Sequence, residues 1–177
     1  KSPNTRSVLY ITHLIDKFLN DNPDIMIYMI TGNHDVYYKN TNSISSLDYF
    51  NHERIHIIKE PLEIGNMLLL PWITRDNKEV IMQSINNSKS DYCLGHFEFE
   101  GFKQHPTDSY LSKGMSITEF KDFKKVISGH IHYSSQKGNV LYTGSLLQLK
   151  KDDRQDPKKY WLLDTEKHTL EPIFHGV

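Results

Sequence analysis

Three short tetrapeptides constrain this chain more than any other feature: Gly32-Asn33-His34-Asp35, Gly95-His96-Phe97-Glu98 and Gly129-His130-Ile131-His132. Each follows an apolar run that predicts a buried strand. A glycine permits a tight turn where the strand ends, and ligands of open α/β sheets bind at the carboxyl ends of strands. The pattern therefore predicts an α/β protein in which three strand ends share one site.

Helix and strand patterns alternate between these tetrapeptides. Residues 7–19 predict an amphipathic helix whose apolar side chains share one face, namely Val8, Ile11, Ile15, Phe18 and Leu19. Residues 25–30 form a continuous apolar run, which predicts a strand covered on both faces. Further strands are predicted at residues 55–58, 66–70, 92–94, 126–127, 140–142 and 160–163. Residues 160–163 are predicted to be the last strand of these 177 residues. A second helix is predicted at residues 79–85.

Two serines carry the spacing of a helix capping box. Ser45 stands three residues before Asp48, and Ser116 stands three residues before Glu119. In this motif each side chain accepts the backbone N–H of the other residue. A short helix is therefore predicted to begin at each serine.

The composition excludes several classes of protein. The 177 residues fit one domain with a sizeable core, and the longest apolar run is too short to span a bilayer. The single cysteine, Cys93, excludes an internal disulfide, predicts a small buried side chain and suits a reducing cytoplasm. The net charge of −1 gives no support to nucleic-acid binding, although metal ions or a partner could supply positive charge. Residues 150–159 mix both signs and predict a solvated loop.

The tetrapeptides contain the side chains of a metal site. Asn33 offers a neutral oxygen to a divalent ion, His34 can exchange a proton near neutral pH, and Asp35 could fix its tautomer. His130 and His132 point the same way in an extended segment, and the glycine before them permits a sharp turn. Each motif alone could be a structural turn, but together they predict metal binding.

Two other residues lie near these motifs in the sequence. His105 follows the second tetrapeptide in a polar loop, where it is either a surface residue or a contact for substrate. Trp72 is predicted to pack beneath the site rather than to stack on a base.

The ordered tetrapeptides resemble the signature of the calcineurin-like metallophosphoesterases, which ends in GNH(D/E), GH and GHxH. The chain is most similar to the SbcD-type DNA repair nuclease branch and, within it, to the recombination endonuclease subunits of T-even-like phages. The similar segments are residues 34–40, 70–72, 95–102, 128–132 and 156–164. The resemblance covers essentially the whole chain and implies a metallophosphoesterase-type layered β-sandwich flanked by helices.

The resemblance also implies a mechanism. Asn33, His96 and His130 would bind one metal ion and His132 a second. His34, with Asp35 beside it, would protonate the leaving oxygen or stabilise charge on phosphorus. The family uses two manganese ions, which a mixed nitrogen and oxygen ligand set can bind.

The function implied is DNA cleavage, as exonuclease and endonuclease, in recombination and double-strand-break repair. The full-length protein would be a homodimer beside an SbcC-type ATPase, in the cytoplasm and away from membranes. The alternatives are a small-molecule phosphoesterase of the same fold and a non-catalytic scaffold of that fold.

The chain departs from the family pattern in its carboxylates. The family carries an Asp-x-His pair and a Gly-Asp upstream of the first tetrapeptide, and the 177 residues contain neither. We therefore expect residues 1–177 to be a partial nuclease domain that lacks the first strands and the C-terminal partner-binding region. We also expect this piece to have little nuclease activity alone, with open sheet edges that invite aggregation.

Overall fold

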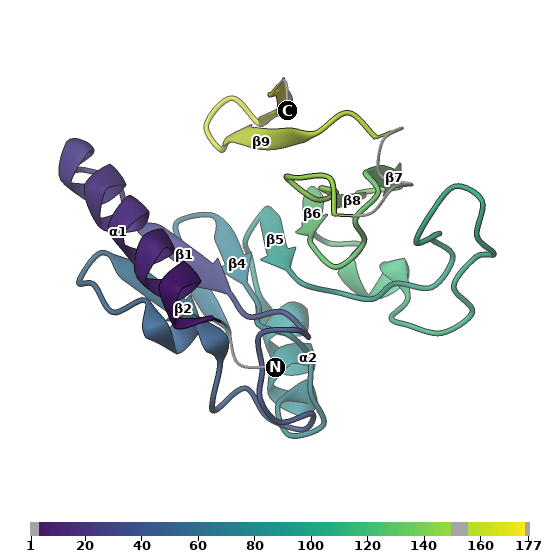
Figure 1. The fold of residues 1–177 in the computed structure, drawn as a ribbon. Coiled ribbons are helices and arrows are strands. Elements are labelled where there is room, and N and C mark those ends of the chain that lie inside the picture. The colour runs from purple at the N-terminus through teal and green to yellow at the C-terminus, as the bar shows by residue number, and fades with distance from the viewer. Residues whose placement is uncertain (1–3, 150–155, 176–177) are drawn as a thin grey trace.

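Helices and strands combine in a mixed α/β arrangement in the computed structural model, which describes residues 4–149 and 156–175 (Figure 1). The helices are α1 (Thr5–Asp21), α2 (Lys78–Asn87) and two 3-10 helices, η1 (Ser46–Tyr49) and η2 (Ile117–Phe120). The strands are β1 (Ile27–Ile30), β2 (Ile55–Ile58), β3 (Leu62–Ile64), β4 (Met67–Leu69), β5 (Tyr92–Gly95), β6 (Lys125–Ser128), β7 (Ser135–Lys137), β8 (Val140–Tyr142), β9 (Lys159–Asp164) and β10 (Thr169–Phe174). Within the described residues, every helix is too short or too polar to cross a bilayer.

The largest sheet has six strands in the order β3-β4-β5-β6-β8-β7. Its four central strands are parallel, and β3 and β7 pair antiparallel with β4 and β8 at the two edges. The edge strands turn back at Gly65 and Gly138, whose φ angles of 55° and 57° lie in the region that favours glycine. Because β5 and β6 are parallel neighbours, His96 and His130 leave the same edge of this sheet.

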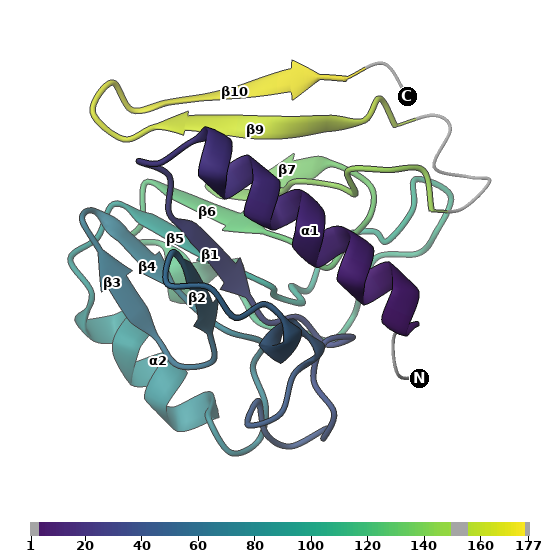
Figure 2. The same ribbon diagram turned by 60° about the vertical axis from the view of Figure 1, so that its left-hand side comes forward.

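A second, two-stranded sheet pairs β1 with β2 in parallel. The prediction that residues 25–30 are covered on both faces is wrong for the described residues, because Met26 remains 43% exposed and Tyr28 is also exposed. The reason is that β1 pairs with β2 rather than within the six-stranded sheet. Figure 2 shows the antiparallel β9–β10 hairpin at one side of the molecule and α2 at the opposite side.

Helix α1 forms as predicted, and its C-terminal end packs against the rest of the chain. Leu19 is fully buried, and the Arg54 guanidinium donates to its carbonyl over 2.7 Å. The remaining apolar face is less covered than predicted, since Phe18 is 47% exposed and Ile11 is also exposed. The sequence pattern identified the helix correctly but overestimated how much of it is buried.

The core lies beneath the central strands and is rich in aromatic rings. Phe97, Phe99 and Phe120 are almost fully buried and pack with ring centroids 5.1–5.6 Å apart. Gly95 makes this packing possible, because a Cβ atom there would lie 2.1 Å from the Phe97 ring. The glycine that precedes His96 is therefore also a requirement of the core.

Both predicted capping boxes are present, at Ser45 before η1 and at Ser116 before η2. Cys93 is buried as predicted, and burial raises the pKa of its thiol. The prediction that residues 160–163 form the last strand is wrong, because β10 follows β9.

The predicted solvated loop at residues 150–159 is only partly described. Residues 150–155 lie outside the described residues. At the end of the run the prediction is wrong, since Asp156 and Lys158 are only 6% and 7% exposed. Their burial is possible because the two side chains form an ion pair of 3.6 Å.

Candidate metal centre

The three tetrapeptides meet around one cavity of about 640 Å³. Side chains from all three motifs line it, and these are Asn33, His34, His96, Glu98, His130 and His132. His34 is exposed, whereas His130 is largely buried. The predicted convergence of the strand ends is therefore confirmed as an arrangement in space.

Asn33 and His96 face each other in this cavity. Asn33 Oδ1 lies 2.9 Å from Nε2 of His96. The His96 ring is held between two glycines, because a Cβ atom at Gly32 or at Gly129 would lie 2.9 Å from the imidazole. Both motif glycines therefore make room for the ring.

The environment of His96 favours a neutral imidazole. Burial, reinforced by the neighbouring imidazoles of His130, His34 and His132, lowers the pKa of His96 from 6.5 to about 4. A neutral ring retains a nitrogen lone pair, which is the form that binds a metal ion.

The third motif turns at His130 rather than at Gly129. β6 ends at Ser128, and His130 has a φ angle of 85°, which is uncommon for a residue other than glycine. The prediction of an extended segment with a turn at Gly129 is therefore wrong. His130 and His132 nevertheless line the same cavity.

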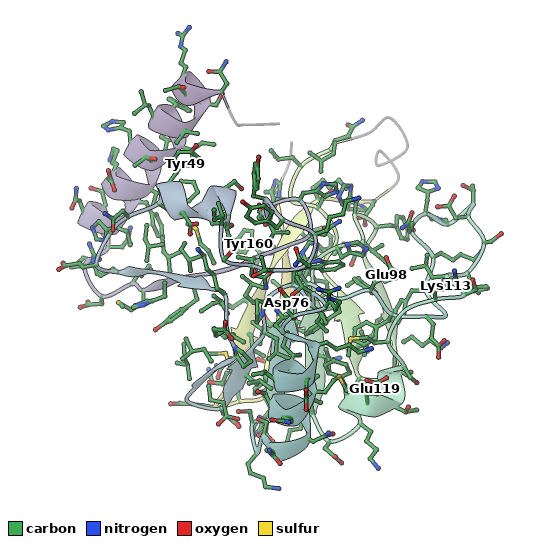
Figure 3. The ribbon with its side chains drawn as sticks, turned by 90° about the horizontal axis from the view of Figure 1, so that it is seen from below. Tyr49, Asp76, Glu98, Lys113, Glu119 and Tyr160 are labelled. Carbon is green, nitrogen blue, oxygen red and sulfur yellow. The ribbon has the colours of Figure 1, made fainter. Side chains whose placement is uncertain are left out.

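Besides Asp108, sequence reasoning missed Glu98 among the carboxylates that line this cavity. The Glu98 carboxylate accepts a hydrogen bond from Nε2 of His130 over 3.2 Å, and Figure 3 shows Glu98 to the right of the middle of the view. The ring of His130 also packs on His96, with centroids 5.2 Å apart. The signal was present in the sequence, because Glu98 stands two residues after His96 in the same tetrapeptide.

Asp35 uses both carboxylate oxygens to hold its own loop. Oδ2 accepts the Gly32 N–H over 2.8 Å, and Oδ1 accepts the Ser46 hydroxyl over 3.4 Å. The Ser46 N–H also donates to the Asp35 carbonyl over 2.8 Å. These bonds fix the turn from which Asn33 and His34 project.

Thr31 joins the first motif to the six-stranded sheet. Its N–H donates to the Ile58 carbonyl over 3.4 Å, and its own carbonyl accepts the Trp72 N–H over 2.8 Å. The Trp72 ring lies against the imidazoles of His96 and His130, with centroids 5.8 and 5.5 Å away. Trp72 therefore packs beside the site, as predicted.

Buried hydroxyl groups position the backbone that carries His96 and Glu98. The Tyr142 hydroxyl donates to the Phe97 carbonyl over 3.0 Å and accepts the Phe99 N–H over 2.9 Å. The Phe97 N–H donates to the Ser128 hydroxyl over 2.9 Å. These three bonds tie the segment after β5 to β6 and β8.

A polar network holds the backbone around His132. The Ser145 N–H donates to the His132 carbonyl over 3.0 Å, and the Lys158 ammonium donates to the Ser145 hydroxyl over 3.0 Å. Asp156 accepts the Ser134 N–H over 3.1 Å and pairs with Lys158. The segment just before β9 therefore supports the turn after β6.

The residues of the cavity fit part of the shell of a divalent ion. Asn33 Oδ1 and His96 Nε2 form a hydrogen bond of 2.9 Å, a separation close to the roughly 3 Å between two neighbouring ligands at about 2.1 Å from an octahedral ion. In residues 4–149 and 156–175, no three His, Cys, Asp or Glu side chains are arranged to hold a metal ion. Asn33 is an amide and falls outside that set of residue types. The candidate shell combines the Asn33 amide with the imidazoles of His96 and His130.

Comparison with known proteins finds relatives along most of the chain. Exonuclease subunit 1 of Enterobacteria phage T4 is 32% identical, and the match covers 86% of this chain and 46% of that protein. The SbcD subunit of nuclease SbcCD from Staphylococcus epidermidis is 27% identical over 87% of this chain, and that from Staphylococcus saprophyticus is 25% identical over 97%. These matches cover 50% and 54% of the two staphylococcal proteins, so the chain spans about half the length of the curated relatives it matches.

Two further comparisons bear on the fold. No protein-family model matches the chain. One solved crystal structure superposes with a TM-score of 0.53 and 15% identity over 98% of this chain and 77% of that one, a likeness that concerns the fold alone. The resemblance in sequence to the SbcD-type nuclease branch is confirmed, and this chain is similar to those nucleases along most of its length.

Proposed function

We propose that the protein containing this chain is a metal-dependent DNA phosphodiesterase, a nuclease subunit that acts on DNA as exonuclease and endonuclease. The observation that carries the proposal is the meeting of Asn33, His96 and His130 beside an exposed His34 in one cavity. The similarity to SbcD-type nucleases supports DNA as the substrate.

In this proposal each side chain has a separate role. Asn33, His96 and His130 would hold one manganese ion, and His132 would be a ligand of a second. Bound metal ions would supply Lewis acidity and lower the pKa of the attacking water. As water adds to phosphorus and the phosphorus–oxygen ester bond breaks, His34 would give its proton to the leaving oxygen. Asp35 would contribute by fixing the loop that presents His34.

The wider setting belongs to the same proposal. We expect the full-length protein to adopt a layered metallophosphoesterase β-sandwich, to form a homodimer and to act with an SbcC-type ATPase in recombination and double-strand-break repair. The 177 residues alone should cleave DNA slowly or not at all, because they contain no Gly-Asp to provide the carboxylate that bridges two ions in the family.

The test is hydrolysis by the full-length protein with Mn²⁺, measured on DNA ends and on a small phosphodiester. We expect DNA cleavage that EDTA abolishes, and a fall in kcat of about 10²–10⁴-fold in His34→Asn, the usual contribution of a general acid. His13→Asn, on the exposed side of α1, is the matched control and should leave kcat unchanged.

Two outcomes would contradict the proposal. Rapid turnover of the small ester without DNA cleavage would instead identify a small-molecule phosphoesterase. Absence of both activities in the metal-loaded protein would identify a non-catalytic scaffold.

A further inference from the structure

A second groove adjoins the metal cavity. It has a volume of about 490 Å³ and is lined by Lys103, Pro106, Tyr110, Tyr133 and Lys137, among others. Most of these residues belong to the loop at residues 101–114, which extends from the sheet between β5 and η2 at the right of Figure 1. The other wall comes from residues around β7.

The loop forms a wall that the groove shares with the metal cavity. His105 and Thr107 line the metal cavity, whereas Lys103 and Tyr110 line the groove. The base of the loop is closed by two backbone hydrogen bonds of Leu111, which accepts the Gly101 N–H over 2.8 Å and donates to the Phe102 carbonyl over 2.7 Å. Residues of this one loop therefore line both the metal cavity and the groove.

The side chains of the groove combine aromatic faces with positive charge. Tyr110 is 68% exposed, and the Lys103 ammonium lies 4.8 Å from the centre of its ring. Tyr133 packs edge-on against His105, with ring centroids 6.1 Å apart. Among the described residues that line the groove, the charged ones are Lys103 and Lys137. The groove is therefore positively charged, although the chain as a whole has a net charge of −1. Aromatic rings that stack on bases, beside cations that contact phosphates, are the features of a single-strand binding surface.

The size of the groove favours single-stranded nucleotides over a duplex. Its volume is in the range of about 300–1,000 Å³ that is usual for sites of small ligands. Bases within a duplex already stack on one another, so a tyrosine face is available only to an unpaired base.

We propose that this groove binds the unpaired nucleotides next to the scissile phosphate. Tyr110 and Tyr133 stack on bases, and Lys103 and Lys137 contact phosphates. The proposal rests on the proposed function, because it takes the strand from the metal cavity into the groove.

The first experiment measures binding without cleavage. The full-length protein in EDTA is titrated with a fluorescent oligothymidylate, and Kd is followed by anisotropy. Tyr110→Ala should raise Kd about tenfold, in the range found for one base on one ring, and Tyr110→Phe should restore binding. Tyr49→Ala, an exposed tyrosine on η1 and away from Glu98 in Figure 3, is the matched control.

The second experiment separates the lysine contacts from general charge. Lys137→Ala should reduce the slope of log Kd against log salt by about one, as expected when one phosphate contact is lost. Lys89→Ala, on the exposed segment after α2, should leave the slope unchanged. An oligonucleotide with 5-iodouracil should cross-link to Tyr110 or Tyr133 on irradiation, which peptide mapping would detect.

The outcomes distinguish this inference from the proposed function. If Tyr110→Ala and Lys137→Ala leave DNA binding unchanged while the protein cleaves DNA, the groove proposal is overturned and the nuclease proposal stands. If the wild-type protein cleaves no DNA but binds the oligonucleotide through Tyr110, the groove is supported and the nuclease proposal fails. If both variants leave Kd unchanged and the cross-links fall outside the groove, the inference is overturned, whether or not the protein cleaves DNA.

Discussion

Asn33 Oδ1 lies 2.9 Å from Nε2 of His96, although the two residues are 63 positions apart in the sequence. If both atoms bind one ion, Asn33→Ala should weaken Mn²⁺ affinity by more than the roughly 10–100-fold that loss of an outer-shell partner costs. Isothermal titration calorimetry of the full-length protein measures this affinity. Asn20→Ala, on the exposed surface of α1, is the control, and an equal loss in both variants would argue against a ligand role for Asn33.

Gly129→Ala should displace the His96 ring. The added Cβ would lie 2.9 Å from Nδ1 of His96, closer than atoms pack, so the ring or the backbone must move. We expect a loss of about 1–3 kcal/mol in the free energy of unfolding and weaker Mn²⁺ binding. Gly65→Ala is the control: its φ of 55° costs about 1–2 kcal/mol in a residue with a Cβ, but no atom lies within 4 Å and metal affinity should not change.

The metal-free protein should lose stability as the pH falls from about 6.5 to 4. The pKa of His96 is lowered to about 4 in the folded chain, and an unfolded histidine has a pKa of about 6.5. Between these values the unfolded state binds more protons, so acid favours unfolding. Because the ring is only partly buried, we expect a contribution of at most about 2 kcal/mol.

Two measurements check this pH dependence. NMR titration of the His96 ring should give a midpoint well below 6.5. In urea titrations at pH 7 and pH 5, His96→Asn should lose stability less steeply with acid than His13→Asn does. A His96 midpoint near 6.5 would contradict the prediction.

Tyr142→Phe should weaken the segment that presents His96 and Glu98. The substitution removes the hydroxyl that bonds to Phe97 and Phe99, and it leaves the Phe99 N–H buried without a partner. An unsatisfied buried donor costs about 1–3 kcal/mol, which urea denaturation can detect. Tyr49→Phe, on an exposed ring, should leave the free energy of unfolding unchanged.

Asp156→Asn should be destabilising because it leaves the buried Lys158 ammonium without its counter-ion. Removing one member of a buried pair costs about 3–5 kcal/mol. The double variant Asp156→Asn/Lys158→Met should recover the part of this loss that comes from the Lys158 charge, whereas Lys159, which also pairs with Asp156 over 3.4 Å, loses its counter-ion in both variants. Additive losses in a double-mutant cycle would show that the two residues act independently.

The sequence predicted the site better than it predicted the details that hold the site together. Apolar runs that end in glycine and histidine indicated which strand ends converge. These runs can be recognised in the sequence because a strand and the turn after it depend on neighbouring residues. The left-handed turn at His130 and the partners of the Asp35 carboxylate depend on contacts between distant segments. Tyr142 could be recognised only as a strand residue, because its hydroxyl meets a backbone some 43–45 residues away.

The same limit explains the errors in burial. An amphipathic or continuous apolar pattern indicates which side chains can be buried, but not which surface covers them. Phe18 and Met26 are therefore more exposed than their patterns predict. Lys158 is more buried than its charged surroundings in the sequence predict, because Asp156 is folded against it.

The backbone of Thr31 links the two sheets, since it bonds to Ile58 at the end of β2 and to Trp72 in the segment that follows β4 of the six-stranded sheet. Asn33 follows β1 of the two-stranded sheet and His96 follows β5 of the six-stranded sheet, so local opening at Thr31 would part them while leaving both sheets folded. Hydrogen exchange at the Thr31 and Trp72 amides reports this opening. A metal ion held by both residues would act as a cross-link between two folding units, and its removal would lower the cooperativity of unfolding.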